Sequence, residues 1–188
     1  MTVSPALDER FRTEAAAQGL LDVAYDVTDT PIGPLLLAAT ERGVCRIGFE
    51  PEATDHLESL ARGFGARVLR SPRPLDPLRR GLDGYFEGRL RSFDLPLDLS
   101  AVPAFHRQVL EELVRIPYGE VATYGGLAAK LQRPRAARAV GGACNRNPIP
   151  IVVPCHRVVG STGSLVGYAG GLDRKRALLD LEAGRLAL

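Results

Sequence analysis

Cys155 and His156 stand side by side at the end of a short apolar run that closes with Pro154. Cysteine is the strongest nucleophile among side chains at neutral pH, and histidine is the usual partner that takes its proton. A free thiol with a pKa near 8.5 is only about 3% thiolate at pH 7, so a neighbouring base or cation matters. The sequence offers both in His156 and Arg157. The segment therefore predicts a reactive thiol.

The spacing of the two residues limits how they can cooperate. Adjacent side chains point to opposite faces of a strand, and on a helix they diverge by about 100°. His156 is thus poorly placed for a direct bond to the thiol of Cys155, and a bridging water suits the pair better. If Pro154 opens a helical turn, the helix dipole would favour the thiolate further.

The distribution of charged residues along the chain suggests that the half containing this thiol binds an anionic partner. Residues 1–100 hold 12 basic and 16 acidic side chains, whereas residues 101–188 hold 12 basic and 6 acidic ones. No Asp or Glu occurs between Glu120 and Asp173, a stretch that carries six Lys and Arg residues. A solvated basic face and a polyanion-binding surface both fit this pattern. Its coincidence with the Cys-His segment favours nucleic acid.

Cysteine and histidine usage bears on metals and on the compartment. The three cysteines (Cys45, Cys144, Cys155) cannot all pair and form no Cys-x-x-Cys motif, and the three histidines are scattered, which argues against a structural zinc site. Free thiols suit a reducing compartment, so we expect a cytoplasmic protein. Charged residues break any secretory signal in the first twenty positions, and no apolar run reaches the ~20 residues of a membrane helix. We therefore expect neither metal nor membrane.

The first half of the chain predicts a small α/β domain. Hydrophobic patterning and turn residues indicate strands at 21–27, 35–39, 43–49 and 92–99, and helices at 55–64 and 77–86. The helix at 77–86 carries an apolar stripe that ends in Tyr85 and Phe86. We expect residues 1–20 to form an N-terminal extension, residues 21–100 the α/β domain and residues 101–188 a second domain.

In the second half the hydrophobic period changes from 2 to 3.6. A helix is predicted from 105 to 116, a second short helix capped by Thr123, a third from Arg135 to about Cys144 with Pro134 in its first turn, and a last one at 173–181. Two short helices joined by a tight turn fit a helix-turn-helix. The third helix is nearly all Ala and Gly around a lone Arg138, so it suits close backbone approach to a minor groove, or simply a tight helix pair.

Four segments together resemble the methylated-DNA–protein-cysteine methyltransferases, the suicidal O6-alkylguanine-DNA repair proteins. They are Gly-Glu-Val-Ala-Thr-Tyr at 119–124, Ala-Ala-Arg-Ala-Val-Gly-Gly-Ala at 136–143, Asn-Pro at 147–148 and Pro-Cys-His-Arg-Val-Val-Gly at 154–160. The segment Gly-Tyr-Ala-Gly-Gly-Leu at 167–172 and Glu182 also match the family pattern. The resemblance implies a ribonuclease-H-like α/β N-terminal domain and a mostly helical C-terminal domain with a helix-turn-helix.

The resemblance also implies a reaction. Double-stranded DNA containing O6-alkylguanine would be the partner, and the damaged nucleotide would be flipped out of the stack. Cys155 would accept the alkyl group irreversibly, which makes each molecule a single-turnover enzyme without cofactor. His156 would act through a water with Glu182 behind it, and Asn147 would tie the cysteine turn to the recognition helix. The protein would act as a monomer.

Further positions take roles by the same resemblance. Arg138 would fill the gap in the base stack and Tyr124 would crowd the phosphate, while Arg135, Ala137 and Gly141 complete the DNA surface. Tyr124, Val158, Tyr168 and Ala169 would form the guanine pocket. Ala169 departs from the family, which has serine there, and this puts a side-chain contact with bulky alkyl groups in doubt.

Two rival readings remain. The first is a non-catalytic DNA-binding protein, either a helix-turn-helix regulator or an alkyl-damage sensor; sensors of this kind lack the cysteine that this chain has at position 155. The second is a cysteine hydrolase that uses Cys155 and His156, against which their adjacent spacing speaks.

Overall fold

The computed structural model describes residues 4, 7, 10–12, 14–15, 18–52 and 55–186. The chain divides into two compact units: residues 1–83 with 94–101, and residues 84–93 with 102–188. Half of the expected N-terminal extension, ten of its twenty residues, falls outside the described residues. None of the helices in the described ranges is long and apolar enough to cross a membrane.

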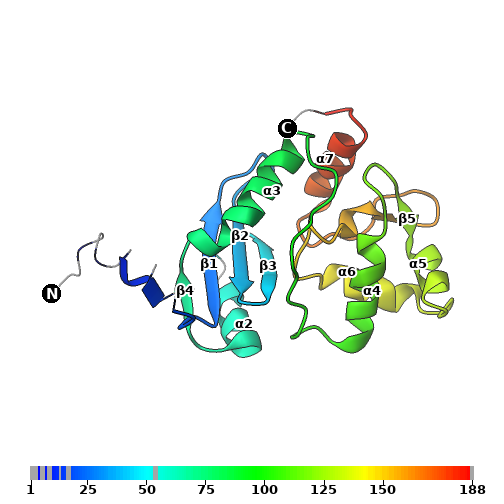
Figure 1. The fold of residues 1–188 in the computed structure, drawn as a ribbon. Coiled ribbons are helices and arrows are strands. Elements are labelled where there is room, and N and C mark those ends of the chain that lie inside the picture. Colours follow the sequence, from blue (N-terminus) through cyan, green and yellow to red (C-terminus); the bar gives the residue numbers. More distant parts are fainter. Residues whose placement is uncertain are drawn as a thin grey trace. The chain divides into compact units, whose positions relative to one another are not determined.

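The first unit is built on a four-stranded mixed sheet (Figure 1). Its strand order is β3 (Gly43–Phe49), β2 (Leu35–Thr40), β1 (Val23–Thr28) and β4 (Val68–Arg70). The first three strands pair antiparallel, and β4 lies parallel to β1. Strands β1 to β3 were predicted within two residues at each end. Strand β4 was missed because three residues are too short to show a period.

Helix α2 (Asp55–Phe64) covers one face of this sheet. Its Leu60 packs in a buried cluster with Val23, Leu36, Ala38 and Cys45. Side chains alternate across a strand, so Leu35 and Leu37 turn to the opposite face, where the 3-10 helix η1 (Arg73–Leu75) contacts β1 and β2. Helix α3 (Asp76–Phe86) continues from η1 and ends in the second unit.

The predicted strand at 92–99 is wrong. The segment forms only one bridge, in which Val44 N–H donates to Pro96 O at 2.9 Å and Asp98 N–H donates to Val44 O at 2.8 Å. Pro96 has no N–H for a ladder, which confines the pairing to a point at the sheet edge. The backbone passes so close to Gly43 that a Cβ there would lie 2.2 Å from Pro96 O. Its apolar and polar alternation thus reflects an edge segment rather than a strand.

The second unit is mostly helical. It contains α4 (Ala104–Val114), α5 (Tyr124–Lys130), α6 (Ala137–Asn145), the 3-10 turn η2 (Cys155–Arg157) and α7 (Leu172–Glu182). A two-residue parallel pair joins β5 (Ala122–Thr123) to β6 (Val158–Val159). The core gathers apolar side chains of the helices and of the loop before η2: Val109, Leu110, Leu113, Leu127, Val140, Ile149, Val153 and Leu178.

Helices α5 and α6 form the predicted helix-turn-helix. Thr123 caps α5, since its Oγ1 accepts a hydrogen bond from Gly126 N–H at 3.0 Å. The third helix begins at Ala137 rather than at Arg135, because Arg133 to Ala136 form a hydrogen-bonded turn closed at 2.8 Å. Pro134 therefore lies in this turn and not in the first turn of the helix.

Candidate active site

A turn after α6 presents Cys155. Asn147 holds it from inside: its Nδ2 donates to Val153 O at 2.8 Å and to Cys155 Sγ at 3.1 Å, while its Oδ1 accepts from Ile149 N–H at 3.0 Å. Ile151 adopts a φ of 75°, a left-handed conformation that a branched side chain rarely takes. The turn is thus fixed by one buried amide, which follows helix α6 in the chain and contacts the sulfur directly.

The thiol of Cys155 is buried, with 4% of the residue exposed. Burial raises its pKa to about 11, although the hydrogen bond from Asn147 and the nearby Lys175 both lower it. Cys155 begins a helical turn directly after Pro154, but this turn, η2, is only three residues long and does not offset burial. Cys155 is therefore a thiol at neutral pH in the free protein, and it needs a proton acceptor to react.

His156 faces Glu182 rather than the thiol. Its Nε2 lies 2.8 Å from Glu182 Oε1, and both side chains are fully buried. A carboxylate only accepts, so Nε2 carries the proton and Nδ1 holds the lone pair. Nδ1 is buried and has no hydrogen-bond partner among the described residues. Burial lowers the pKa of His156, which keeps the ring neutral and able to accept a proton at Nδ1.

Glu182, on the last turn of α7, gathers hydrogen-bond donors from four places. Besides His156, it accepts from Arg157 Nε at 2.9 Å, from Tyr85 O–H at 2.7 Å and from Gly119 N–H at 3.0 Å. Burial alone would raise the pKa of this carboxyl, but the bonds from His156 and Arg157 lower it to about 2. Glu182 therefore remains a carboxylate even when its neighbour imidazole becomes charged.

Arg157 does not serve the thiol, contrary to expectation. Its guanidinium bonds Glu182 through Nε and Nη2, and its Nη1 donates to Ile116 O at 2.6 Å. The cation whose charge lowers the pKa of the Cys155 thiol is Lys175, which the sequence reasoning missed. Lys175 is fully buried on α7, and its Nζ donates to the carbonyls of Val158 at 2.6 Å and Val166 at 3.0 Å. These bonds tie strand β6 to the loop that carries Tyr168.

The predicted guanine-pocket residues lie on β6 and this loop. Val158 is buried, Tyr168 is partly buried and Ala169 is exposed. Tyr168 lies near enough to Cys155 for the two groups to interact electrostatically. Tyr124, the first residue of α5, donates its hydroxyl proton to Val166 O at 3.0 Å and so contacts the same loop. The four positions thus group around one loop close to the thiol.

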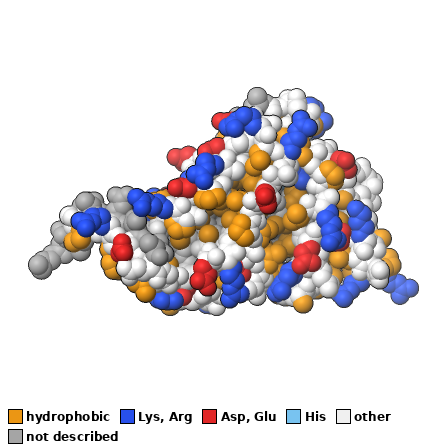
Figure 2. Space-filling view, viewed as in Figure 1, with side chains coloured by type: hydrophobic (Ala, Val, Ile, Leu, Met, Phe, Trp, Pro, Cys, Tyr) orange, Lys and Arg blue, Asp and Glu red, His pale blue; other side chains and the backbone are white. Residues whose placement is uncertain are grey.

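The predicted DNA-facing residues lie on or just before helix α6. Arg135 and Arg138 are exposed, whereas Ala137 and Gly141 are partly exposed. A Cβ on Gly141 would lie 3.7 Å from the ring of Tyr124, which shows how closely α5 and α6 approach. Arg133, in the turn between the two helices, stacks over the ring of Phe105, with its Cζ 5.1 Å from the ring centroid. Figure 2 shows Lys and Arg side chains on the surface over α4 and α5.

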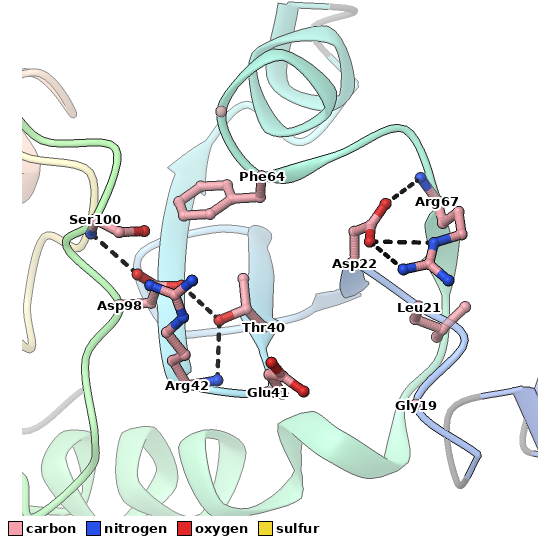
Figure 3. A pocket seen from close by; sticks show the side chains of 11 residues that line it. Gly19, Leu21, Asp22, Thr40, Glu41, Arg42, Phe64, Arg67, Asp98 and Ser100 are labelled. Atoms are coloured by element: carbon pink, nitrogen blue, oxygen red, sulfur yellow. Dashed lines mark hydrogen bonds and ion pairs between the residues drawn. The ribbon is translucent and has the colours of Figure 1, made fainter.

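A separate polar cavity of about 290 Å³ lies in the first unit (Figure 3). Asp22 accepts three hydrogen bonds from Arg67, and Asp98 accepts from Thr40 Oγ1 at 2.7 Å and from Ser100 N–H at 3.0 Å. Each carboxylate oxygen of Asp22 and Asp98 thus has a partner, and these hydrogen bonds join neighbouring segments of the unit. Across the described ranges, no three His, Cys, Asp or Glu side chains gather as a metal site.

Comparison with known proteins places this geometry in a family. Residues 104–184 match the DNA-binding domain of 6-O-methylguanine DNA methyltransferase, and residues 23–99 match the ribonuclease-like domain of the same protein. The methylated-DNA–protein-cysteine methyltransferase of Methanosarcina barkeri is 44% identical over 86% of this chain and 98% of its own. That of Mycobacterium tuberculosis strain H37Rv is 42% identical over 87% and 94%.

Solved structures agree. The crystal structure of Mycobacterium tuberculosis OGT in complex with DNA has a TM-score of 0.75 and 41% identity, and the match covers 87% of this chain and 95% of that one. The O6-methylguanine-DNA methyltransferase of Pyrococcus kodakaraensis has a TM-score of 0.61 and 30% identity, with 85% and 98% covered. The two-domain architecture predicted from the sequence is confirmed, and the chain belongs to the 6-O-methylguanine DNA methyltransferase family.

Proposed function

We propose that this protein repairs O6-alkylguanine in DNA by transferring the alkyl group to Cys155, irreversibly and once per molecule. The observation that carries the proposal is the arrangement around the sulfur. Asn147 donates to Cys155 Sγ, and the His156–Glu182 pair beside it leaves one imidazole nitrogen free to accept a proton. The curated relatives at 42–44% identity carry the name of this activity.

The reaction balances as a single displacement. The thiolate sulfur attacks the alkyl carbon, an S–C bond forms, and the C–O6 bond breaks with its electron pair left on guanine. The thiol proton passes through a water to His156 Nδ1, and guanine takes up one proton as it is restored. With a pKa of about 11, roughly one thiol in 10⁴ is ionised at pH 7, so this proton transfer has to accompany substrate binding.

Each neighbour of the sulfur has a part in that step. Glu182 holds the Nε2–H tautomer and stabilises the imidazolium that forms. Lys175 supplies a positive charge near the developing thiolate and orders the loop that bears Tyr168. In this proposal Val158, Tyr168, Ala169 and Tyr124 bind the flipped guanine. The resulting thioether is not hydrolysed by water, which explains why the protein acts once.

DNA binding is assigned to helices α5 and α6. A guanine O6 inside a duplex is out of reach, so the nucleotide must leave the stack at a cost of about a few kcal/mol. In this proposal Arg138, which is exposed, fills the gap in the base stack, and Tyr124 crowds the phosphate. Ala137 and Gly141 allow the backbone of α6 to approach the groove, and Arg135 adds a phosphate contact.

The decisive experiment weighs the peptide that contains Cys155 after reaction with an oligonucleotide bearing O6-methylguanine. One added methylene per molecule is expected, with guanine restored in the DNA. An unchanged mass after complete incubation contradicts the proposal. Cys155→Ser should bind the same DNA with unchanged affinity and gain no mass, which separates binding from transfer.

The role of Arg138 has its own test. Arg138→Ala should slow transfer from duplex DNA more than from single strands, because only the duplex leaves a stack to fill. Arg176→Ala, which removes an exposed arginine of α7, is the matched control. Equal slowing on both substrates would refute the stack-filling role. Binding should weaken as salt rises, without strong sequence preference.

The rival reading as a non-catalytic damage sensor is disfavoured by the presence of Cys155 in its supported turn. Several further assignments belong to the proposal. We infer a monomer in a reducing, cytoplasmic setting, in keeping with three free buried thiols. The division into an extension at 1–20, an α/β domain at 21–100 and an alkyl-acceptor domain at 101–188 is proposed likewise.

A further inference from the structure

Tyr85 is a tyrosine whose hydroxyl group contacts the proposed proton relay, which consists of His156 and Glu182. It lies on the last turn of α3 and is fully buried. Its ring packs against the rings of Phe86, Phe93 and Tyr118 at centroid distances of 5.4, 5.6 and 6.0 Å. A phenylalanine would fill this aromatic cluster equally well, so packing does not explain the hydroxyl.

The hydroxyl forms a triangle with the two relay groups. It lies 2.7 Å from Glu182 Oε1 and 3.4 Å from His156 Nε2, which is itself 2.8 Å from the same oxygen. Because Nε2 carries a proton, it cannot accept from the phenol, so the tyrosine proton points to Oε1. Burial, and then the neighbouring carboxylate, raises the pKa of Tyr85 above its ordinary value, so the hydroxyl stays a donor.

Donors that share one carboxylate oxygen compete for its charge, and Glu182 Oε1 accepts from Tyr85, His156 and Arg157. A carboxylate oxygen that already accepts from a phenol has less charge to offer an imidazolium, and its position is fixed by both partners. Arg157 donates to both oxygens, from Nη2 to Oε1 at 2.9 Å and from Nε to Oε2 at 2.9 Å, whereas Gly119 N–H donates to Oε2. Tyr85 is therefore the uncharged side-chain donor that shares Oε1 with the histidine, and its bond to that oxygen, at 2.7 Å, is the shortest of those that Oε1 accepts.

We propose that Tyr85 is a positioning residue of the proton relay, which holds Glu182 Oε1 opposite His156 and weakens its pull on the histidine proton. A weaker pull leaves His156 neutral in the resting protein and ready to accept the thiol proton. The inference rests on the proposed function, because it concerns the same relay.

The position of Tyr85 in the chain gives the inference wider meaning. Tyr85 falls within residues 23–99, the match to the ribonuclease-like domain, whereas Cys155, His156 and Glu182 fall within residues 104–184. All four residues nevertheless lie in the second compact unit, which includes residues 84–93. A residue of the segment matched to the ribonuclease-like domain thus belongs to the same unit as the relay.

The test is Tyr85→Phe in the full chain, which keeps the ring and removes the hydroxyl. Single-turnover rates of methyl transfer from a duplex bearing O6-methylguanine are measured from pH 5 to pH 9. We expect the plateau rate to fall about tenfold, the effect of one lost hydrogen bond to a charged group. We also expect the acid-side inflection to move to higher pH, because Glu182 then attracts the imidazolium proton more strongly.

Tyr118→Phe is the matched control. Its ring contacts that of Tyr85, and its hydroxyl bonds none of the relay groups among the described residues, so its profile should follow the wild type. The inference is overturned if the acid-side inflection of the Tyr85→Phe rate profile stays at the wild-type pH or moves to lower pH, whatever the plateau rate. The proposed function fails separately, if the wild-type protein itself takes up no methyl group.

Discussion

Replacement of Glu182 by glutamine should cost stability in a pH-dependent way. The carboxylate is buried, and it accepts hydrogen bonds from His156, Arg157, Tyr85 and Gly119. Glutamine keeps the shape but removes the charge, which leaves the buried guanidinium of Arg157 without its counter-ion. Breaking a buried pair in this way costs about 3–5 kcal/mol at neutral pH.

The pH dependence follows from the lowered pKa of the carboxyl. The folded value is about 2 against an ordinary 4.5, so the charge stabilises the fold fully above pH 4.5, and that contribution is lost as the pH falls towards 2. The gap corresponds to about 3 kcal/mol in total, of which about 2 kcal/mol is lost by pH 3. Glutamine has no proton to gain, so the difference between wild type and variant should shrink by about 2 kcal/mol from pH 7 to pH 3.

Urea unfolding followed by circular dichroism at pH 7, 5, 4 and 3 measures this difference. Taking wild type minus variant at each pH cancels the titration of the other carboxylates. Glu111→Gln, at an exposed position of α4, is the control and should show a small difference that does not change with pH. A difference for Glu182→Gln that stays constant from pH 7 to pH 3 would refute the role assigned to the charge.

Three further outcomes are expected. Lys175→Met should slow the reaction of Cys155 with iodoacetamide at pH 7.5 by about three- to tenfold, because a nearby positive charge that lowers the thiol pKa is removed; mass spectrometry of the Cys155 peptide over time measures this. Asn147→Ala should slow the same reaction, since the hydrogen bond to sulfur also lowers that pKa, and an unchanged rate would contradict the contact. Thr123→Ala should lower the free energy of unfolding by about 1 kcal/mol through loss of the cap to Gly126 N–H, as measured by urea titration.

The periodicity of the apolar residues predicted most of the strands and helices. It failed where a local feature, such as a proline, prevents the structure that the pattern suggests. The strands at 23–28, 35–40 and 43–49 and the helices at 55–64 and 104–114 follow their apolar spacing closely. The alternation at 92–99 was misleading because Pro96 prevents a ladder. Helix α6 starts at Ala137, two residues after the predicted start at Arg135, because a hydrogen bond from Ala136 N–H to Arg133 O closes a turn there. Proline is common both in such turns and in the first turn of a helix, so Pro134 did not distinguish the two.

The chemistry of the site was harder to predict, because it depends on which residues meet. Of the residues singled out by the resemblance, Asn147 contacts the sulfur and His156 contacts Glu182. Tyr85 was placed in an apolar stripe, and its burial is as predicted. The partner of its hydroxyl lies 97 residues away along the chain, which no local pattern encodes.

Helix α7 nevertheless contained a signal that could have identified the missed cation. Its buried residues are Lys175, Leu178, Leu181 and Glu182, which follow one face at helical spacing. Two ionisable side chains thus stand on an otherwise apolar stripe, where burial is costly unless each has a partner. The lysine finds its partners in the carbonyls of β6 and of the loop that carries Tyr168, and the glutamate finds one in His156, the residue after Cys155. A charged residue on the inward face of a helix that follows a Cys-His segment is therefore a better guide to such a site than the arginine next to the cysteine.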